Sequence, residues 1–156
     1  HVRSRRQRQM CIRDSPRPVM TKTSALVAWL KTRITSLPGL AVYDGAVPNS
    51  VPLYPGTQRI KPYVAVWTTP NREPDETTLD HTHTGRAGDV TLTVAADTAA
   101  NVREISDAVI AAIHRQPTPG AGEYIHSEPH VPIQIDIQVT PARYYQPLRF
   151  RLLTAY

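Results

Sequence analysis

The chain has 156 residues, with 18 Lys and Arg against 13 Asp and Glu and a single Cys, and its formal net charge is +5. This is the length of one ordinary domain, and the sequence holds no apolar run long enough for a transmembrane helix. One Cys excludes a disulfide framework within the chain.

The opening stretch, residues 1–15, differs from the rest because it carries five Arg and the only Cys. Such a basic cluster is typical of a disordered arm that neutralises phosphates, and without an apolar core it is not a signal peptide. Its last eleven residues, RRQRQMCIRDS, instead resemble a translated transposase-type sequencing adapter. We therefore expect residues 1–19 to be a non-native, disordered leader and 20–156 to be a single domain that starts at Met20.

This leader accounts for the positive charge. Residues 1–19 hold six Arg and one Asp, so 12 basic and 12 acidic residues remain and the expected domain is neutral. A neutral domain gives no electrostatic reason to expect nucleic acid or a membrane surface as partner. Without Cys11 it also has no thiol for catalysis.

The first expected element of the domain is a helix within residues 21–39, capped by Thr23 or Ser24 and ended by Pro38-Gly39. Its apolar residues recur at helical spacing: Leu26, Val27, Leu30, Ile34 and Leu37. A short strand follows in LAVYDG, residues 40–45, and then a Pro-rich loop over 46–62. The β-branched and aromatic residues of YVAVWTT, residues 63–69, predict the second strand.

The second half begins with a long polar loop, residues 70–88, and an alternating strand, DVTLTVAAD, at 89–97. Asp97 or Thr98 is expected to cap a second helix at 99–115, whose apolar stripe is Val102, Ile105, Val109, Ala112 and Ile113. After a loop at 116–129, VPIQIDIQVT at 131–140 has the clearest strand alternation in the chain. A last strand is expected from about Leu148.

The expected order is therefore α-β-β-β-α-β-β. Each strand has one apolar and one polar face, and each helix has one apolar side to cover. These features predict an α+β fold, a two-layer sandwich of an antiparallel or mixed sheet with two helices on one face.

The sequence gives little support to catalysis or metal binding. Asp80, His81 and His83 are a possible metal or acid–base group, but no third ligand stands at a recognisable spacing. His126 and His130 are four residues apart, yet Pro129 between them argues against the helix that makes this spacing useful. There is no Gly-x-Ser-x-Gly elbow and no phosphate-binding glycine loop.

Two polar segments remain as candidates for contacts. The acidic run of the long loop lacks the spacing of a calcium-binding EF-hand and is expected to be solvated. Near the end, Arg and aromatic residues alternate in ARYYQPLRFR, which suits a weak nucleic-acid surface or a protein interface. Because the domain is neutral, the interface is favoured.

The chain resembles the tail terminator (tail completion, or minor tail) proteins of siphophages, especially those of actinobacterial phages. Five segments carry the resemblance in order, over nearly all of 20–156: LPGLAVYDGAVP, PYVAVWTTP after the Pro-rich loop, the polar loop, GDVTLTVAAD followed by NVREISDAVIAAI, and VTPARYYQPLRFRL.

The resemblance implies an α+β subunit without catalytic residues or cofactors. Such a subunit assembles as a ring, usually a hexamer, at the head-proximal end of the virion tail, after a period in the host cytoplasm. Its partners are further copies of itself, the tail tube protein and the head-side connector, with no specific nucleic acid and no membrane. Another neck protein of the head–tail junction, or a small metal-dependent enzyme using Asp80, His81 and His83, are the alternatives.

The same resemblance gives roles to the two polar segments. The long loop is a candidate for contact with the tube or the ring lumen, through Arg72, Glu73, Asp75, Glu76, Asp80 and Arg86. The terminal segment is a candidate for contact between subunits, through Arg143, Tyr144, Tyr145, Arg149 and Arg151.

Overall fold

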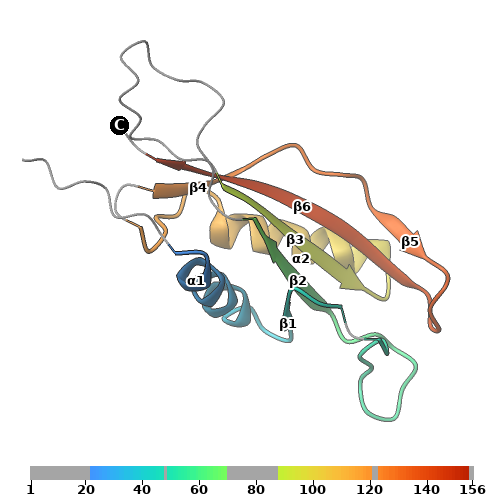
Figure 1. The fold of residues 1–156 in the computed structure, drawn as a ribbon. Coiled ribbons are helices and arrows are strands. Elements are labelled where there is room, and N and C mark those ends of the chain that lie inside the picture. The colour runs from blue at the N-terminus through green and yellow to red at the C-terminus, as the bar shows by residue number, and fades with distance from the viewer. Residues whose placement is uncertain (1–21, 48, 70–87, 121–122, 155–156) are drawn as a thin grey trace, which may run out of the picture.

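The computed structural model describes residues 22–47, 49–69, 88–120 and 123–154, which form two helices and a six-stranded mixed sheet (Figure 1). This confirms the predicted α+β class. The elements in chain order are α1 (Thr23–Thr35), β1 (Ala41–Asp44), β2 (Tyr63–Thr68), β3 (Gly88–Ala96), α2 (Ala99–Ile113), β4 (Glu123–Ser127), β5 (Gln134–Asp136) and β6 (Arg143–Thr154).

The strands lie in the order β1-β2-β3-β6-β4, and β5 pairs with the same side of β6 as β4 does. Only β1 and β2 are parallel, and the other pairs are antiparallel. One row crosses the whole sheet from β1 to β5, and it runs through Ala41, Tyr63, Ala95, Tyr145 and Gln134. The two short outer strands β1 and β5 therefore begin at the same height of the sheet.

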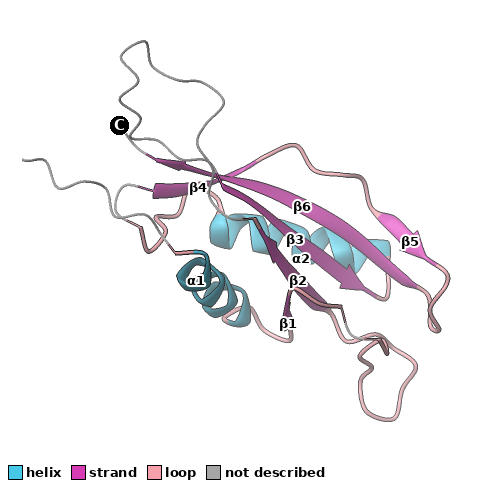
Figure 2. Cartoon of the chain, in the orientation of Figure 1, coloured by secondary structure: helices cyan, strands magenta, loops and turns pink. Residues whose placement is uncertain are grey.

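Both helices cover one face of this sheet, and they contact each other as well as the strands. In Figure 2 the helices form one layer, and α2 passes behind β3 and β6. Their apolar sides meet alternate residues of β2, β3 and β6 in one core that includes Leu30, Val64, Leu92, Val109 and Leu148. The order of burial in β3 follows the alternation of its sequence.

The helix ends agree only partly with the sequence. Thr98 caps α2, since its Oγ1 accepts a hydrogen bond from the Asn101 N–H at 3.2 Å. The prediction that Thr23 or Ser24 caps α1 is wrong, because both are already helical. Lys22 takes the extended cap position and makes no side-chain hydrogen bond there.

The strands of the last third differ most from the expected ones. A strand not predicted, β4, lies within the expected loop, and β6 starts at Arg143 rather than near Leu148. The expected strand over 131–140 is reduced to the three residues of β5, with Ile135 and Ile137 exposed.

Pro147 gives the physical reason why two separate strands flank β6. The Arg149 N–H points to the outer side of β6, where it donates to His130 Nδ1 at 3.0 Å. By the alternation of a strand, residue 147 faces the same side, and as a proline it has no N–H to donate. β4 pairs with residues 150–154 and β5 with 143–145, so Pro147 lies in the gap between them.

Candidate interaction surface

The face of the sheet opposite the helices is covered by no described helix, and we call it the open face. Its outward residues alternate with the buried ones along β2, β3, β4 and β6. Between Trp67 of β2 and Tyr124 of β4 it bears the following further side chains: Asp89, Thr91, His126, Arg149, Arg151 and Leu153.

Two arginines form the centre of the open face. Arg149 lies beside Thr91, which lies beside Trp67, and Arg151 lies between Asp89 and His126 in the next row. The Arg151 Nε is 3.8 Å from Asp89 Oδ1, and both side chains are about half exposed. Such an exposed ion pair contributes little to stability, so these charges remain available for contacts with another molecule.

Large apolar side chains border the arginines. Trp67, Tyr124 and Leu153 are each about 40 % exposed (39 %, 41 % and 42 %), and Leu153 pairs with Tyr124. Aromatic residues and Arg are the types that protein interfaces favour at their centres. The alternation of YVAVWT already places Trp67 on the other face of the strand from the buried Val64 and Val66. The exposure of Trp67 could therefore have been predicted from the sequence.

At the other end of β6, Arg143 belongs to a partly buried hydrogen-bond network. Its Nε and Nη2 donate to Asp136 Oδ2 at 3.1 and 2.8 Å, and its Nη1 donates to Tyr63 Oη at 2.8 Å. Burial raises the pKa of Tyr63, against the opposing effect of Arg143. A small pocket of about 190 Å³ lies here, lined in part by Val47 and Thr93.

The five residues expected at a subunit interface thus fall into two groups. Arg149 and Arg151 are exposed on the open face, and Arg143 and Tyr145 share that face by the alternation of β6 but are held by neighbouring side chains. Arg143 holds Asp136 and Tyr63, Tyr144 packs against the helix-side core, and Tyr145 packs beside Tyr63 and donates from its hydroxyl to Gln134 at 2.6 Å. The second group connects β6 to its neighbouring elements.

The predicted loop residues lie outside the described part of the chain. This applies to the tube or lumen candidates and to the possible metal group, which together are Arg72, Glu73, Asp75, Glu76, Asp80, His81, His83 and Arg86. Within the described ranges, no group of three or more His, Cys, Asp or Glu is placed to hold a metal ion.

Two histidines accept backbone N–H groups that have no strand partner, one at the outer edge of β4 and one in the gap between β4 and β5. His114 Nδ1 accepts the Ser127 N–H at 2.9 Å, and His130 Nδ1 accepts the Arg149 N–H. A neutral ring that accepts at Nδ1 carries its proton at Nε2, and His130 Nε2 is 3.0 Å from Ser127 Oγ. Partial burial lowers the pKa of His130.

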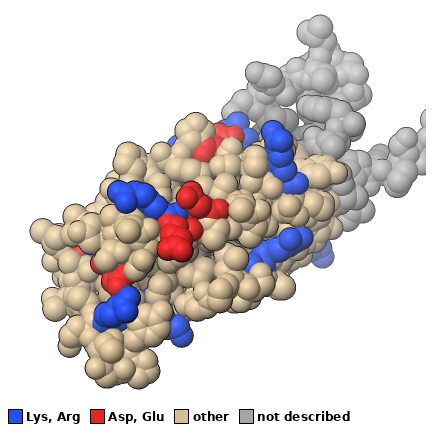
Figure 3. Space-filling view, turned by 180° about the vertical axis from the view of Figure 1, so that it is seen from behind, with Lys and Arg blue, Asp and Glu red and all other residues tan. Residues whose placement is uncertain are grey.

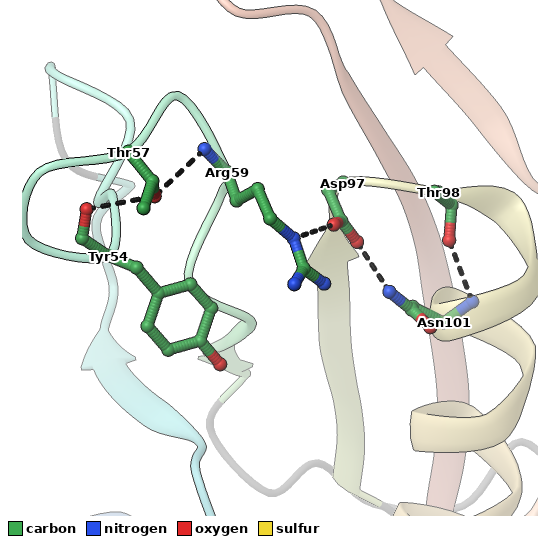
Figure 4. Close-up of polar contacts among 6 residues, drawn as sticks. All are labelled: Tyr54, Thr57, Arg59, Asp97, Thr98 and Asn101. Atoms are coloured by element: carbon green, nitrogen blue, oxygen red, sulfur yellow. Dashed lines mark hydrogen bonds and ion pairs between the residues drawn. The ribbon is translucent and has the colours of Figure 1, made fainter.

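Two grooves flank α2 on the helix side. The larger, about 520 Å³, lies between α2, His130 and Ile133, and at its wall Ser106 Oγ donates to Gln146 Oε1 at 3.0 Å. The smaller, about 230 Å³, lies by the start of α2, where Arg59 Nε donates to Asp97 Oδ2 at 3.3 Å (Figure 4).

The polar side chains that line these grooves form hydrogen bonds with each other, and these bonds connect neighbouring elements of the fold. Asp97 joins the Pro-rich loop to the first turn of α2, where it also accepts from the Asn101 side chain. Seen from the side on which α2 lies, positive and negative side chains are interspersed among uncharged ones (Figure 3). This side therefore presents no field of a single sign.

No protein-family model and no curated protein matches the chain. None of the described helices has the length and apolar character needed to cross a membrane.

Proposed function

We propose that this chain is a structural subunit of a phage tail, which caps the tail tube, stops its polymerisation and joins it to the head connector. The proposal starts from the order of sequence segments that resembles tail terminators. In this role the chain acts by contact alone, and it would form a ring, expected to be a hexamer, in the virion.

One observation supports the proposal best: a sheet face that no described helix covers exposes Trp67, Tyr124 and Leu153 around Arg149 and Arg151. Exposed apolar side chains gathered on one face mark a surface that contacts other molecules, and a subunit held between two other rings needs such a surface. The interspersed charges of the opposite side do not favour nucleic acid as the partner.

Sequencing the source DNA downstream of this reading frame tests the proposal at the level of the genome. A terminator is expected to be followed by a tail-tube-like frame and then by a very long, helical tape-measure-like frame. Portal or head-closure frames on both sides would support the alternative of a different neck protein. Unrelated metabolic frames would contradict both.

A further inference from the structure

The sheet has two outer strands whose hydrogen-bonding edges meet no partner among the described residues, and they are β1 and β5. The third outer strand, β4, is different, because the Arg115 N–H donates to the Ile125 carbonyl and the Ile125 N–H donates to the Gln116 carbonyl. Unpaired edges bind other strands unless they are protected, and neither AVYD nor QID contains the Lys, Arg or Pro that would protect them.

The outward backbone groups of each edge follow from the bonds on its inner side. In β1 the N–H groups of Ala41 and Gly45 donate to Pro62 and Val66 next to β2, so those of Val42 and Asp44 point away from the sheet. In β6 the backbone N–H of Arg149 points toward the side on which β5 lies, and by alternation so do those of Tyr145 and Arg143. Gln134 and Asp136 lie opposite these two residues, so their backbone groups point toward β6. The backbone of Ile135 therefore points outward.

We propose that β5 of one copy pairs with β1 of the next, so that copies of this chain join head to tail into one continuous sheet. This rests on the proposed function and names the surface by which the ring would close. β1 runs parallel to β2 and β6, and β5 runs antiparallel to β6. The new strand pair is therefore antiparallel when the copies share one orientation.

The faces of the two strands match. Val42 lies on the helix side of the sheet, where it packs against the core, and Ile135 lies on that side too, opposite Tyr144. Opposed residues of antiparallel strands point to the same face, so the pair keeps all helices on one side. It also covers Ile135 and Ile137, which are 48 % and 76 % exposed in the single copy.

The charges near the two edges favour pairing of β5 with β1 over pairing of two identical edges. Residues 22–47, around β1, contain Lys22, Lys31 and Arg33 against Asp44, a balance of three minus one, or +2. Residues 127–142, around β5, contain Glu128 and Asp136 and no Lys or Arg, but Asp136 is paired with Arg143, which leaves the charge of Glu128. The two borders therefore carry opposite charge, whereas two β1 borders repel each other.

The height of the two edges sets the shift that pairing requires. A head-to-tail contact gives a closed ring only when successive copies are not displaced along the ring axis, and otherwise gives a filament. Ala41 of β1 and Gln134 of β5 stand in the same row of the sheet, and the two strands run in opposite directions from it. Bringing Val42 opposite Ile135 therefore takes a shift of two residues along the strands, and the tilt of each copy in the ring has to absorb it.

Two edge prolines test this in the full chain. Asp44→Pro and Ile135→Pro each remove one outward N–H without removing a bond to the neighbouring strand, which is where edge strands tolerate proline. The mass in solution is measured by light scattering after size exclusion. The unchanged chain is expected to assemble, and each variant alone is expected to be monomeric.

Mixing the two variants is the decisive step. Asp44→Pro keeps its β5 edge and Ile135→Pro keeps its β1 edge, so an equimolar mixture is expected to give a one-to-one heterodimer and nothing larger. This outcome also proves that both variants are folded. Ile137→Lys, a change outside the strand, is a second variant that should weaken assembly.

The inference is overturned if the unchanged chain stays monomeric at every concentration, if either variant still assembles alone, or if folded variants fail to form the heterodimer. The proposed function is judged separately, by the capping of tubes. Capping without edge pairing would remove this inference alone, and edge pairing without capping would remove the proposed function alone.

Discussion

Arg143 donates two hydrogen bonds to the same carboxylate oxygen of Asp136, from Nε at 3.1 Å and from Nη2 at 2.8 Å. The two side chains are only 17 % and 23 % exposed, and they join β6 to β5. The same guanidinium reaches Tyr63 of β2. This single side chain therefore holds β5, the strand that forms one border of the sheet, in place.

Arg143→Met is expected to lower the free energy of unfolding by about 2 kcal/mol, because Asp136 loses two charge-assisted hydrogen bonds in a half-buried site. Urea unfolding measures the loss. Arg149→Met is the matched control on the same strand, and it should change stability by no more than about 0.5 kcal/mol because Arg149 is exposed. Equal losses for the two variants would contradict the structural role of Arg143.

Ser106→Ala is expected to cost about 1 kcal/mol of stability, because Gln146 Oε1 loses its hydrogen-bond donor in a site where Ser106 is 3 % exposed. Ser24→Ala, at an exposed position of α1, is the control for the change in helix propensity. Thermal unfolding compares the two. A control that is as unstable as Ser106→Ala would show that the hydrogen bond contributes nothing.

Acid is expected to destabilise the fold through His130. Its pKa is lowered by partial burial from the ordinary 6.5, so the unfolded chain takes up a proton before the folded one does as pH falls. The stabilisation is complete above about pH 6.5 and declines below it, where the proton at Nδ1 also displaces the Arg149 N–H.

Unfolding in urea at about pH 7.5 and about pH 5.5 measures this dependence. His130→Gln should reduce the difference between the two pH values. A proton NMR titration that places the pKa of His130 above 6.5 would contradict the prediction, because stability would then rise as the pH falls.

Reversing the charge of the open face is expected to impair tail joining. Arg149→Glu with Arg151→Glu leaves the buried core intact, since both side chains are exposed, but reverses the centre of the proposed contact surface. Joining of heads and tails in an extract is measured by infectious titre. Lys22→Glu with Arg103→Glu, two exposed positions at the helices, is the control, and an equal titre for both doubles would remove the open face from the proposal.

Most of the fold could be predicted because hydrophobic periodicity reports burial directly. The expected helices contain α1 and α2, and the alternation of β3 agrees with its burial. The clearest alternation, at 131–140, did not correspond to a buried strand. Its isoleucines are exposed at a border of the sheet, so the pattern describes an apolar face without showing what covers it.

The rest depended on distant partners. Arg143 and Arg149 look alike in the sequence. The contacts with Asp136 and with Tyr63, which is 80 residues from Arg143, distinguish the partly buried Arg143 from the exposed Arg149. β4 was hidden in a segment rich in Gly and Pro, and Pro147 concealed the start of β6 because a proline is not expected inside a strand. The strand tolerates this proline because residue 147 lies in the gap between β4 and β5, where no neighbouring strand needs its N–H.

The most direct test of the proposed function is to image tail tubes polymerised with and without this chain and to measure their lengths. Our account predicts density for the chain at one end of each tube and an arrest of growth that depends on its concentration. Tubes of unchanged length with bare ends, in the presence of folded chain, would contradict it.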